Sequence, residues 1–448
     1  MRSLQATLRV AEFRALLVSY VINRAGDFVG ALALAVVVLA ATGSALATAV
    51  LFLATQFLPG LLGPPIVAHL DRAAPGRLLP ALYVTEAALF SVLALIVHRA
   101  GVAVIIALAF ADATLAFVAR AVTRSATAST LIPHDLMPEG KAAFNAALAL
   151  AMIAGPLLGG IAVGVLSAST ALAIDAGSFL VAAGLILREP GLRRDARPDA
   201  AGPPTATASP TRGRLREGLR YIAGRPALRD LILGEGIAFV FFYLVVPVTV
   251  VYAAHSLHGG AGGYAAILAS WGAGIAIGSV IQFRLARRVG ATMILISTTA
   301  VALGYLGTAA APTIVVACAA SVLGGIGNGT QWSSVETLLH RLVDEEFRTR
   351  TAAVLEALAS LAPGVGILLG GALTVAFSPR AAYLVAGLGL LVLVTAGGVF
   401  AGALNVHGDD QHSPAPGERR RRGRHPRPSR LAGGTAEPDR GDRADVVA

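Results

Sequence analysis

Residues 130–160 read TLIPHDLMPEGKAAFNAALALAMIAGPLLGG, and residues 337–371 read TLLHRLVDEEFRTRTAAVLEALASLAPGVGILLGG. Both stretches begin with Thr-Leu, pass through a short charged loop and enter an apolar helix that contains a proline. The two starting threonines are separated by the same interval as the two prolines, Pro156 and Pro363. A shared period of this length indicates an internal repeat, so the sequence predicts two similar halves in parallel.

The composition places both halves in a membrane. Of the 448 residues, 55% are apolar and only 14% are charged, whereas an ordinary soluble domain has about 25% charged residues. A water-soluble protein needs a charged surface around its apolar core, and this composition has too few charged residues to form one. A soluble enzyme and a disordered or disulfide-rich secreted protein are therefore excluded. The single cysteine, Cys318, provides neither a disulfide framework nor a cysteine metal site. We expect no metal and no cofactor.

Twelve apolar segments are long enough to span a bilayer, whose core of about 30 Å needs roughly 20 residues of helix. The sequence therefore predicts an all-α polytopic membrane protein in which twelve transmembrane helices form two six-helix halves. The expected spans are 14–41, 45–70, 78–98, 102–123, 142–166, 168–187, 229–253, 263–284, 291–310, 313–336, 352–377 and 380–403.

The spans and the segments between them define four expected regions. Residues 1–187 form the first six-helix half, and residues 229–403 form the second. Between them, residues 188–228 form a cytoplasmic linker that is rich in proline, alanine and threonine and that ends in an amphipathic helix over 214–222. The final region, 404–448, is an arginine-rich tail with the composition of a disordered cytoplasmic segment.

Arginine gathers in every second connection between spans, which predicts the orientation of the chain. The first and last segments and the linker lie on the basic side, so both termini should face the cytoplasm in a multi-pass plasma membrane protein. The net charge of +10 is then a topology signal and an attraction to the membrane surface. It requires no nucleic-acid partner.

The loop after the second span, GPPIVAHLDRAAPGRLL, resembles the Gly-x-x-x-Asp-Arg-x-Gly-Arg-Arg loop of the major facilitator superfamily. Asp71, Arg72, Gly76 and Arg77 match that pattern, and Val67 replaces its first glycine. The resemblance implies the fold of that superfamily and a cytoplasmic gate at this loop. A simpler alternative is that the two arginines only set the topology.

A second resemblance lies in the fifth span, where Gly155, Pro156, Gly159 and Gly160 match the Gly-Pro-x-x-Gly-Gly element of exporters in the superfamily. Small residues allow close helix approach, and proline interrupts a helix, so these residues and Pro363 of the repeat are candidate bending elements for a rocking motion. The alternative is close packing with no role in motion.

Ionisable side chains inside the spans are the candidate machinery, because an ionisable group is costly at the middle of a bilayer. Arg24 and Asp27 share one face of the first span, Asp112 lies in the fourth, and Glu235 lies in the seventh. In the resembled superfamily these spans line a central cavity, so we expect the four residues to couple transport to protons. The alternative for Arg24 and Asp27 is a permanent structural pair. Other polar or aromatic candidates within the spans are Gln56, Glu86, Asp175, Trp271, Asn328, Gln331 and Trp332.

The opening stretch, LLVSYVINRAGDFVGALALAVVVLAATGSALATAVLFLATQFLPGLLGPP (16–65), resembles the enterobactin-exporter-like branch, which exports drugs and siderophores. The resemblance implies a monomeric, proton-coupled exporter of a small amphipathic molecule that works by alternating access. A proton-coupled importer of a nutrient is the second possibility. A sensor or an embedded enzyme is a third, which lacks a supporting residue cluster. No phosphate-binding Gly-x-x-x-x-Gly-Lys loop is present, so this chain should not hydrolyse ATP.

Overall fold

The computed structural model describes residues 2–70, 74–193, 212–285 and 291–411. Contacts divide the chain into one unit at Met1–Ala401 and a second at Gly402–Ala448. Asp71 and Arg72 of the predicted gate loop lie outside the described residues. Most of the predicted basic tail does so as well.

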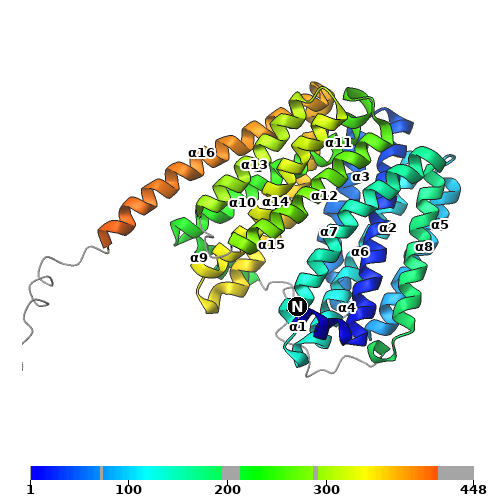
Figure 1. Ribbon diagram of the computed structural model, residues 1–448, viewed down its shortest axis with the longest axis horizontal. Helices are drawn as coiled ribbons and strands as arrows, with labels where there is room; N and C mark the ends of the chain where they lie inside the picture. The colour runs from blue at the N-terminus through cyan, green and yellow to red at the C-terminus, as the bar shows by residue number, and fades with distance from the viewer. Residues whose placement is uncertain (1, 71–73, 194–211, 286–290, 412–448) are drawn as a thin grey trace, which may run out of the picture. The chain divides into compact units, whose positions relative to one another are not determined.

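Helices make up the described chain, which contains no strand, and twelve helical segments in it are long and apolar enough to cross a membrane. This confirms the predicted fold class. In chain order the spans, shown in Figure 1, are α2 (Ala11–Thr42), α3 (Ala45–Phe52) with η1 (Leu53–Phe57) and α4 (Leu58–Leu70), α5 (Pro75–Ile96), α6 (Val102–Leu131) with η2 (Ile132–His134), α7 (Met137–Ile161) with η3 (Ala162–Leu166), α8 (Ala168–Leu187), α10 (Pro226–Leu244) with α11 (Val246–Val251) and η6 (Tyr252–Ser256), α12 (Gly260–Leu285), α13 (Ala291–Ala310), α14 (Ile314–Leu342), α15 (Arg348–Ala376) and α16 (Pro379–Gln411). The remaining elements are α1 (Arg2–Arg9), η4 (Pro190–Arg193), α9 (Arg212–Ala223) and η8 (Glu345–Phe347).

Local capping explains several span boundaries. The side chains of Ser44, Ser167 and Thr313 each accept a hydrogen bond from the backbone N–H three residues later, which satisfies a free donor at the start of a helix. Gly43 ends α2 in the left-handed region at φ 60°, where a side chain would be strained. These turns can therefore be sharp, and successive spans run antiparallel.

Two spans of the first half show how the helices differ from the prediction. The predicted fourth span ends at residue 123, but α6 runs to Leu131 through a Ser/Thr/Ala-rich segment whose low hydropathy hides it from a search for apolar residues. The fifth span, α7, keeps its helical course through Pro156 and then widens into the π-turn η3. Because proline has no backbone N–H, the predicted interruption is limited to the hydrogen bond that residue 156 would donate to Met152.

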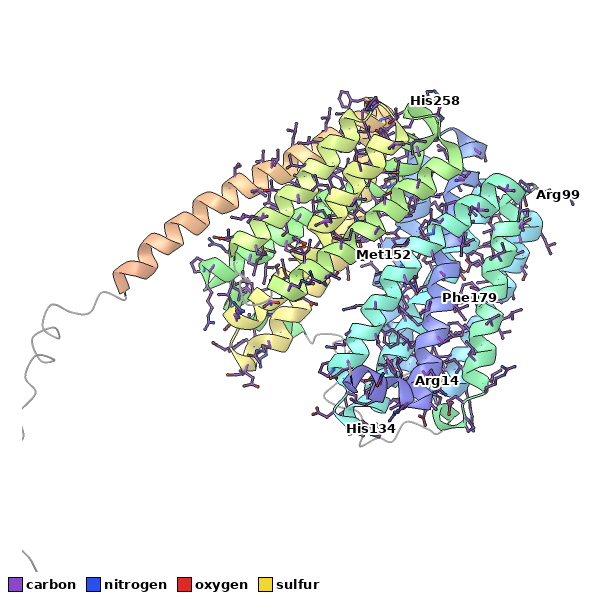
Figure 2. The ribbon with its side chains drawn as sticks, in the orientation of Figure 1. Arg14, Arg99, His134, Met152, Phe179 and His258 are labelled. Carbon is purple, nitrogen blue, oxygen red and sulfur yellow. The ribbon has the colours of Figure 1, made fainter. Side chains whose placement is uncertain are left out.

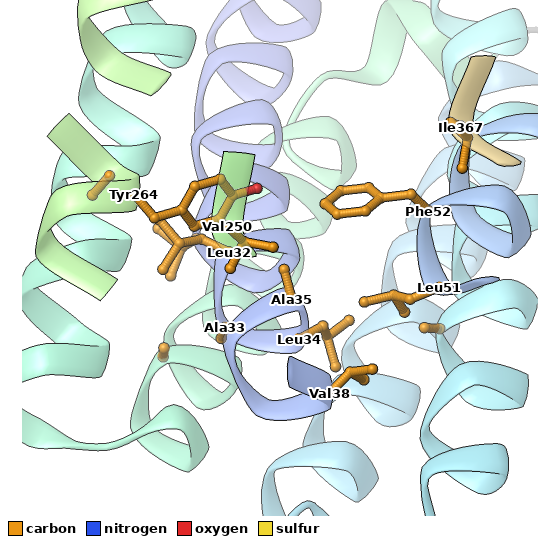
Figure 3. Close-up of a cluster of buried hydrophobic side chains, with 14 of the residues drawn as sticks. Leu32, Ala33, Leu34, Ala35, Val38, Leu51, Phe52, Val250, Tyr264 and Ile367 are labelled. Atoms are coloured by element: carbon orange, nitrogen blue, oxygen red, sulfur yellow. The ribbon is translucent and has the colours of Figure 1, made fainter. Parts of the chain in front are cut away.

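The six spans of each half pack mainly among themselves, with α2 against α7 and α8 in the first half and α14 between α12 and α13 in the second. The halves touch mainly where α15 packs against α3 and η1 and where α12 packs against α7, and α11 adds contacts with α3 and α2. Glycines allow this approach: Gly160 of α7 lies against Ala265, and Gly371 of α15 lies against Ala49. Figure 3 shows the apolar cluster at this junction, to which Leu32, Phe52, Val250, Tyr264 and Ile367 belong.

The outer surface of the spans is apolar, as a lipid-facing protein requires. Leu95, Val165 and Val315 are 75–80% exposed, although a soluble fold would bury such side chains. The interior is apolar too, and it also buries a small number of polar and charged side chains. The surface and the core therefore differ less in polarity than in a water-soluble protein, and the few buried polar groups become the place to look for a site.

The helix before the second half, α9, is fastened to the connection between α14 and α15. Tyr221 stacks on Phe347 with ring centroids 4.1 Å apart, and Arg225 forms an ion pair with Asp344 at 2.6 Å. Ile222 is buried beneath them. In the first half, α1 holds a similar position in the chain, before the first span, and packs against α2 and α7.

Candidate functional site

The unit Met1–Ala401 contains a cavity of about 1050 Å³. Helices α2 to α6 form most of its wall, and the second half contributes Tyr243 and part of α15. Figure 2 marks the two ends of the spans, with His134 and Arg14 at one end and His258 and Arg99 at the other. The contacts between the halves lie toward the His258 end. The polar and aromatic lining comprises Arg24, Asp27, Thr55, Gln56, Asp112, Arg120, Arg124, Ser125, Tyr243, Ser360, Phe28, Phe52, Phe90 and Phe117.

Three of the four predicted charged residues line this cavity. Arg24 donates to Asp27 at 2.5 Å, in the i,i+3 arrangement that the sequence predicts. The guanidinium also lies over the ring of Phe28, 5.2 Å from its centroid. With only 20% and 16% of these side chains exposed, the pair sits in a poorly hydrated wall where each charge depends on the other.

Asp112 lies deeper in the wall, with 7% of the residue exposed. Its Oδ1 atom has no hydrogen-bond partner among the described residues. Its electrostatic neighbours include Asp27 and Arg120. A carboxylate in this position lacks the direct partner that Asp27 has, so it is the less stabilised of the two as an anion.

Glu235 is not among the residues that line the cavity. It is 3% exposed inside the second half and accepts a hydrogen bond of 2.6 Å from the amide of Gln331. The structure therefore brings Arg24, Asp27 and Asp112 together and separates Glu235 from them. Gln331, one of the polar candidates in the tenth span, is its direct partner.

The exporter-like glycine element packs against two helices. Gly155 and Gly159 face α2 at Phe28 and Val29, where an added Cβ would collide or press closely. Gly160 faces the second half, and Pro363 lines the cavity from α15. The element therefore lies between the cavity helix α2 and the junction of the halves.

Of the gate loop, Gly76 and Arg77 are described. Both lie in the first turn of α5, where Gly76 is buried and Arg77 is exposed. Val67, which replaces the first glycine of the loop pattern, is buried and lines the cavity.

The glycine run of the tenth span is a packing surface. Gly325 and Gly329 of α14 approach the α12 backbone, and Gly327 approaches α13. Gly324 lies under the ring of Trp271, which stacks on Tyr305 at 5.4 Å. The glycines of this run therefore serve close helix packing.

Arg120 and Arg124 are cavity residues that the sequence analysis missed. They lie one turn apart on α6, on the same stripe as Asp112. The sequence places Arg124 in a loop because the predicted span ends too early. The available signal was the spacing, since 112, 116, 120 and 124 repeat every fourth position.

No group of three or more potential metal ligands occurs among the described residues. The arrangement is instead an aromatic-lined cavity with two carboxylates and three arginines in its wall. Such a site can bind a small molecule through rings and charges, and its carboxylates can exchange protons with water in the cavity.

Comparisons with known proteins identify the architecture. Residues 231–435 match the family model described as Major Facilitator Superfamily. A bacterial homologue of the iron transporter ferroportin, in an inward-facing state, is similar in structure with a TM-score of 0.63, 15% identity, and coverage of 86% of this chain and 99% of that one. A bacterial homologue of the human lysosomal transporter Spinster, inward-facing and unoccupied, gives 0.60 and 15%, with 88% and 96% covered.

A variant of the nucleoside transporter NupG gives a TM-score of 0.59 at 12% identity, with 87% of this chain and 99% of that chain covered. No curated protein sequence matches the chain. Identities this low establish the fold alone. The chain therefore has the major facilitator fold, and residues 231–435 also match that superfamily by sequence.

Proposed function

We propose that this chain is a proton-coupled secondary transporter of the major facilitator superfamily that exports a small amphipathic molecule across the plasma membrane. The observation that carries the proposal is the cavity of about 1050 Å³ whose apolar, aromatic wall contains Arg24, Asp27 and Asp112. Its volume is at the upper end of the range for small-molecule sites, roughly 300–1,000 Å³. Rings would hold the apolar part of the molecule, and the charged groups would orient its polar part.

In this proposal Asp112 and Asp27 carry the coupling proton. Burying an ion without a partner costs several kcal/mol, so Asp112 is most stable as a neutral acid while the wall is dry and loses its proton when water enters. Asp27 is held as an anion by Arg24 and becomes protonatable when that pair separates. Alternating exposure of these groups would load a proton on one side and release it on the other.

The direction of transport rests on two resemblances, the Gly155–Gly160 element and the opening stretch typical of the enterobactin-exporter-like branch. Substrates of that branch are drugs, secondary metabolites and siderophores. The arginine-rich loops support a cytoplasmic position for both termini. In that orientation, contact between the halves toward the His258 end is what an inward-facing state requires. A single copy contains the complete cavity, which supports a monomer.

The proposal is tested first in cells and then in vesicles. A strain that lacks the transporter, with and without the restored chain, is screened against toxic amphipathic compounds, and a compound to which the chain gives resistance becomes the substrate for vesicle assays. An imposed pH gradient should drive its transport by the wild type. Asp112→Asn should abolish the gradient-driven component, and Asp27→Asn should reduce it, because neither amide can carry a proton.

Asp230→Asn is the control, since Asp230 pairs with Arg229 outside the cavity. Unchanged gradient-driven transport in both cavity variants would refute proton coupling at these residues. Accumulation of the compound in restored cells, instead of resistance, would favour the importer.

A further inference from the structure

Two more carboxylates lie behind the cavity wall of the first half. Glu86 of α5 and Asp175 of α8 are both 0% exposed, and neither lines the cavity. With Asp27 and Asp112 they place four acidic side chains in the interior of one half. Two cations, Arg24 and Arg120, are the arginines within electrostatic range of them.

Glu86 has no hydrogen-bond partner for either carboxylate oxygen among the described residues. The charged groups around it are Asp112 and Arg120 from α6, Asp27 from α2, and Asp175 from α8. Tyr83, one turn earlier on α5, is the further titratable group beside it. Three of the four charged neighbours are acids, so the surroundings disfavour a carboxylate anion at Glu86.

Asp175 is pressed against the backbone of α2. A Cβ added at Gly26 or at Gly30 would collide with its carboxylate oxygens, so these two glycines create the space that the side chain fills. Its Oδ1 accepts a hydrogen bond of 3.3 Å from Ser178, and its Oδ2 has no partner among the described residues. The charged groups around it are Asp27 and Arg24 from α2 and Asp112 from α6.

The two arginines near these side chains can balance at most two of the four acids. Arg24 is already paired with Asp27, and Arg120 reaches the interior from the cavity wall, where Arg124 is its neighbour. Glu86 and Asp175 are both fully buried, and neither forms an ion pair with an arginine among the described residues. A carboxyl group that is fully buried and unpaired is stable as the neutral acid.

We infer that Glu86 and Asp175 each hold a proton in this state and form a proton reserve behind the cavity. The inference rests on the proposed function, because it adds two proton-binding groups to a transporter whose cavity carries Asp27 and Asp112. The ligand of this second site is the proton itself.

Arg24 can connect the reserve to the cavity. Its Nε has no hydrogen-bond partner among the described residues, although it is buried, and both Asp27 and Asp175 lie within its electrostatic range. If the guanidinium turns from Asp27 to Asp175, the Asp175 proton is released and Asp27 takes up a proton. One O–H bond breaks and one forms, and the number of charges stays the same.

Infrared spectroscopy of the purified full-length protein tests the inference, because the C=O stretch of a carboxylic acid differs from the bands of a carboxylate. The wild type at neutral pH should show acid bands that shift in D₂O. Glu86→Gln and Asp175→Asn should each remove a distinct part of them. Asp230→Asn, at an ion-paired surface acid, should remove carboxylate absorption and leave the acid bands intact.

Loss of carboxylate absorption with intact acid bands in both interior variants would overturn the inference. If one variant yields no folded protein, Ser178→Ala decides for Asp175, because loss of the hydrogen bond should shift that acid band while the carboxyl group remains. An unshifted spectrum in Ser178→Ala would count against a proton on Asp175.

The pH profile of gradient-driven transport separates this inference from the proposed function. The amides imitate the neutral acids in shape, so a purely structural role predicts an unchanged profile, whereas a reserve predicts a shifted one in Glu86→Gln and Asp175→Asn. If Asp112→Asn leaves coupling intact while the acid bands disappear as expected, the reserve stands and the proposed role of Asp112 fails. The reverse result retains the proposed function and rejects the reserve.

Discussion

The interiors of the two halves differ in what they bury, although the halves share one repeat. The first half places four acids and two arginines among its helices, while the second half places Glu235 against the neutral amide of Gln331. The second half also buries Tyr252, Tyr264, Tyr305 and Tyr383 near its His258 end. The repeat therefore supplies a common scaffold, and the ionisable machinery is concentrated in one copy. The cavity follows this division, since most of its wall comes from the first half.

The largest effect is expected from removing Arg24, the cation that pairs with Asp27. Arg24→Ala should lower the free energy of unfolding by about 3 kcal/mol, because removing one partner of a poorly hydrated pair leaves an uncompensated charge. Thermal unfolding of the purified protein measures this. Arg24→Ala combined with Asp27→Asn should recover most of the loss. Arg229→Ala, which breaks a surface pair with Asp230, should cost less than about 1 kcal/mol, and an equal cost for both arginines would contradict the comparison.

Packing around Asp175 gives the next largest effect. Gly30→Ala should cost about 2 kcal/mol, since the added methyl group collides with the buried carboxylate and with Phe90. Gly177 of α8 is the matched position, because nothing lies within 4 Å of an added Cβ there. Gly177→Ala should be neutral or stabilising by up to about 1 kcal/mol. If Gly30→Ala and Gly177→Ala had the same free energy of unfolding, α2 would not need this close approach to Asp175.

A smaller effect is expected from the acid of the second half. Glu235→Gln should change stability by about 1 kcal/mol or less, because an amide can still bond with Gln331. Gradient-driven transport should persist in this variant, in contrast to Asp112→Asn. If both variants lose coupling equally, the assignment of proton chemistry to the first half is wrong, and Glu235 regains the role that the sequence predicts for it.

The smallest effect concerns how α9 is held on the second half. The hydrogen bond from Arg225 lowers the pKa of Asp344 and raises the pKa of Arg225 itself. The folded-state pKa of Asp344 therefore lies below that of the unfolded chain, so its contribution is complete above the usual aspartate pKa and is lost as the pH falls through the lower, folded value. Both side chains are well exposed, so solvent screens this contribution.

A spin label at Leu219, an exposed position on α9, should become more mobile over that acidic range in a chain with Cys318→Ala. The same label in an Asp344→Asn variant should be mobile at every pH. A label whose mobility does not depend on pH in either protein would show that the stacked rings of Tyr221 and Phe347 hold the helix without the ion pair.

The twelve spans were predictable because hydropathy and length decide which segments cross a bilayer. The i,i+3 pair of Arg24 and Asp27 was predictable because one helix determines its geometry. Membership of the cavity was harder to predict, since it depends on how each helix is rotated against its neighbours. Glu235 was misplaced for that reason, and Arg124 was missed because the end of α6 is rich in small polar residues. The contact between Asp175 and the glycines of α2 joins residues from the first and sixth spans, and local sequence does not encode it.

The position of the two tryptophans gives the molecule a built-in optical reporter. The chain contains two, Trp271 and Trp332, and both lie in the second half. Trp271 stacks on Tyr305. The ring centroid of Trp332 lies 5.7 Å from that of Phe239, which is one helical turn after Glu235. Tryptophan emission therefore comes from the second half only, while the acids of the first half are optically silent. A compound that binds in the cavity and alters the tryptophan emission would reveal that movement has passed from the acid-rich half to the other one, without any label.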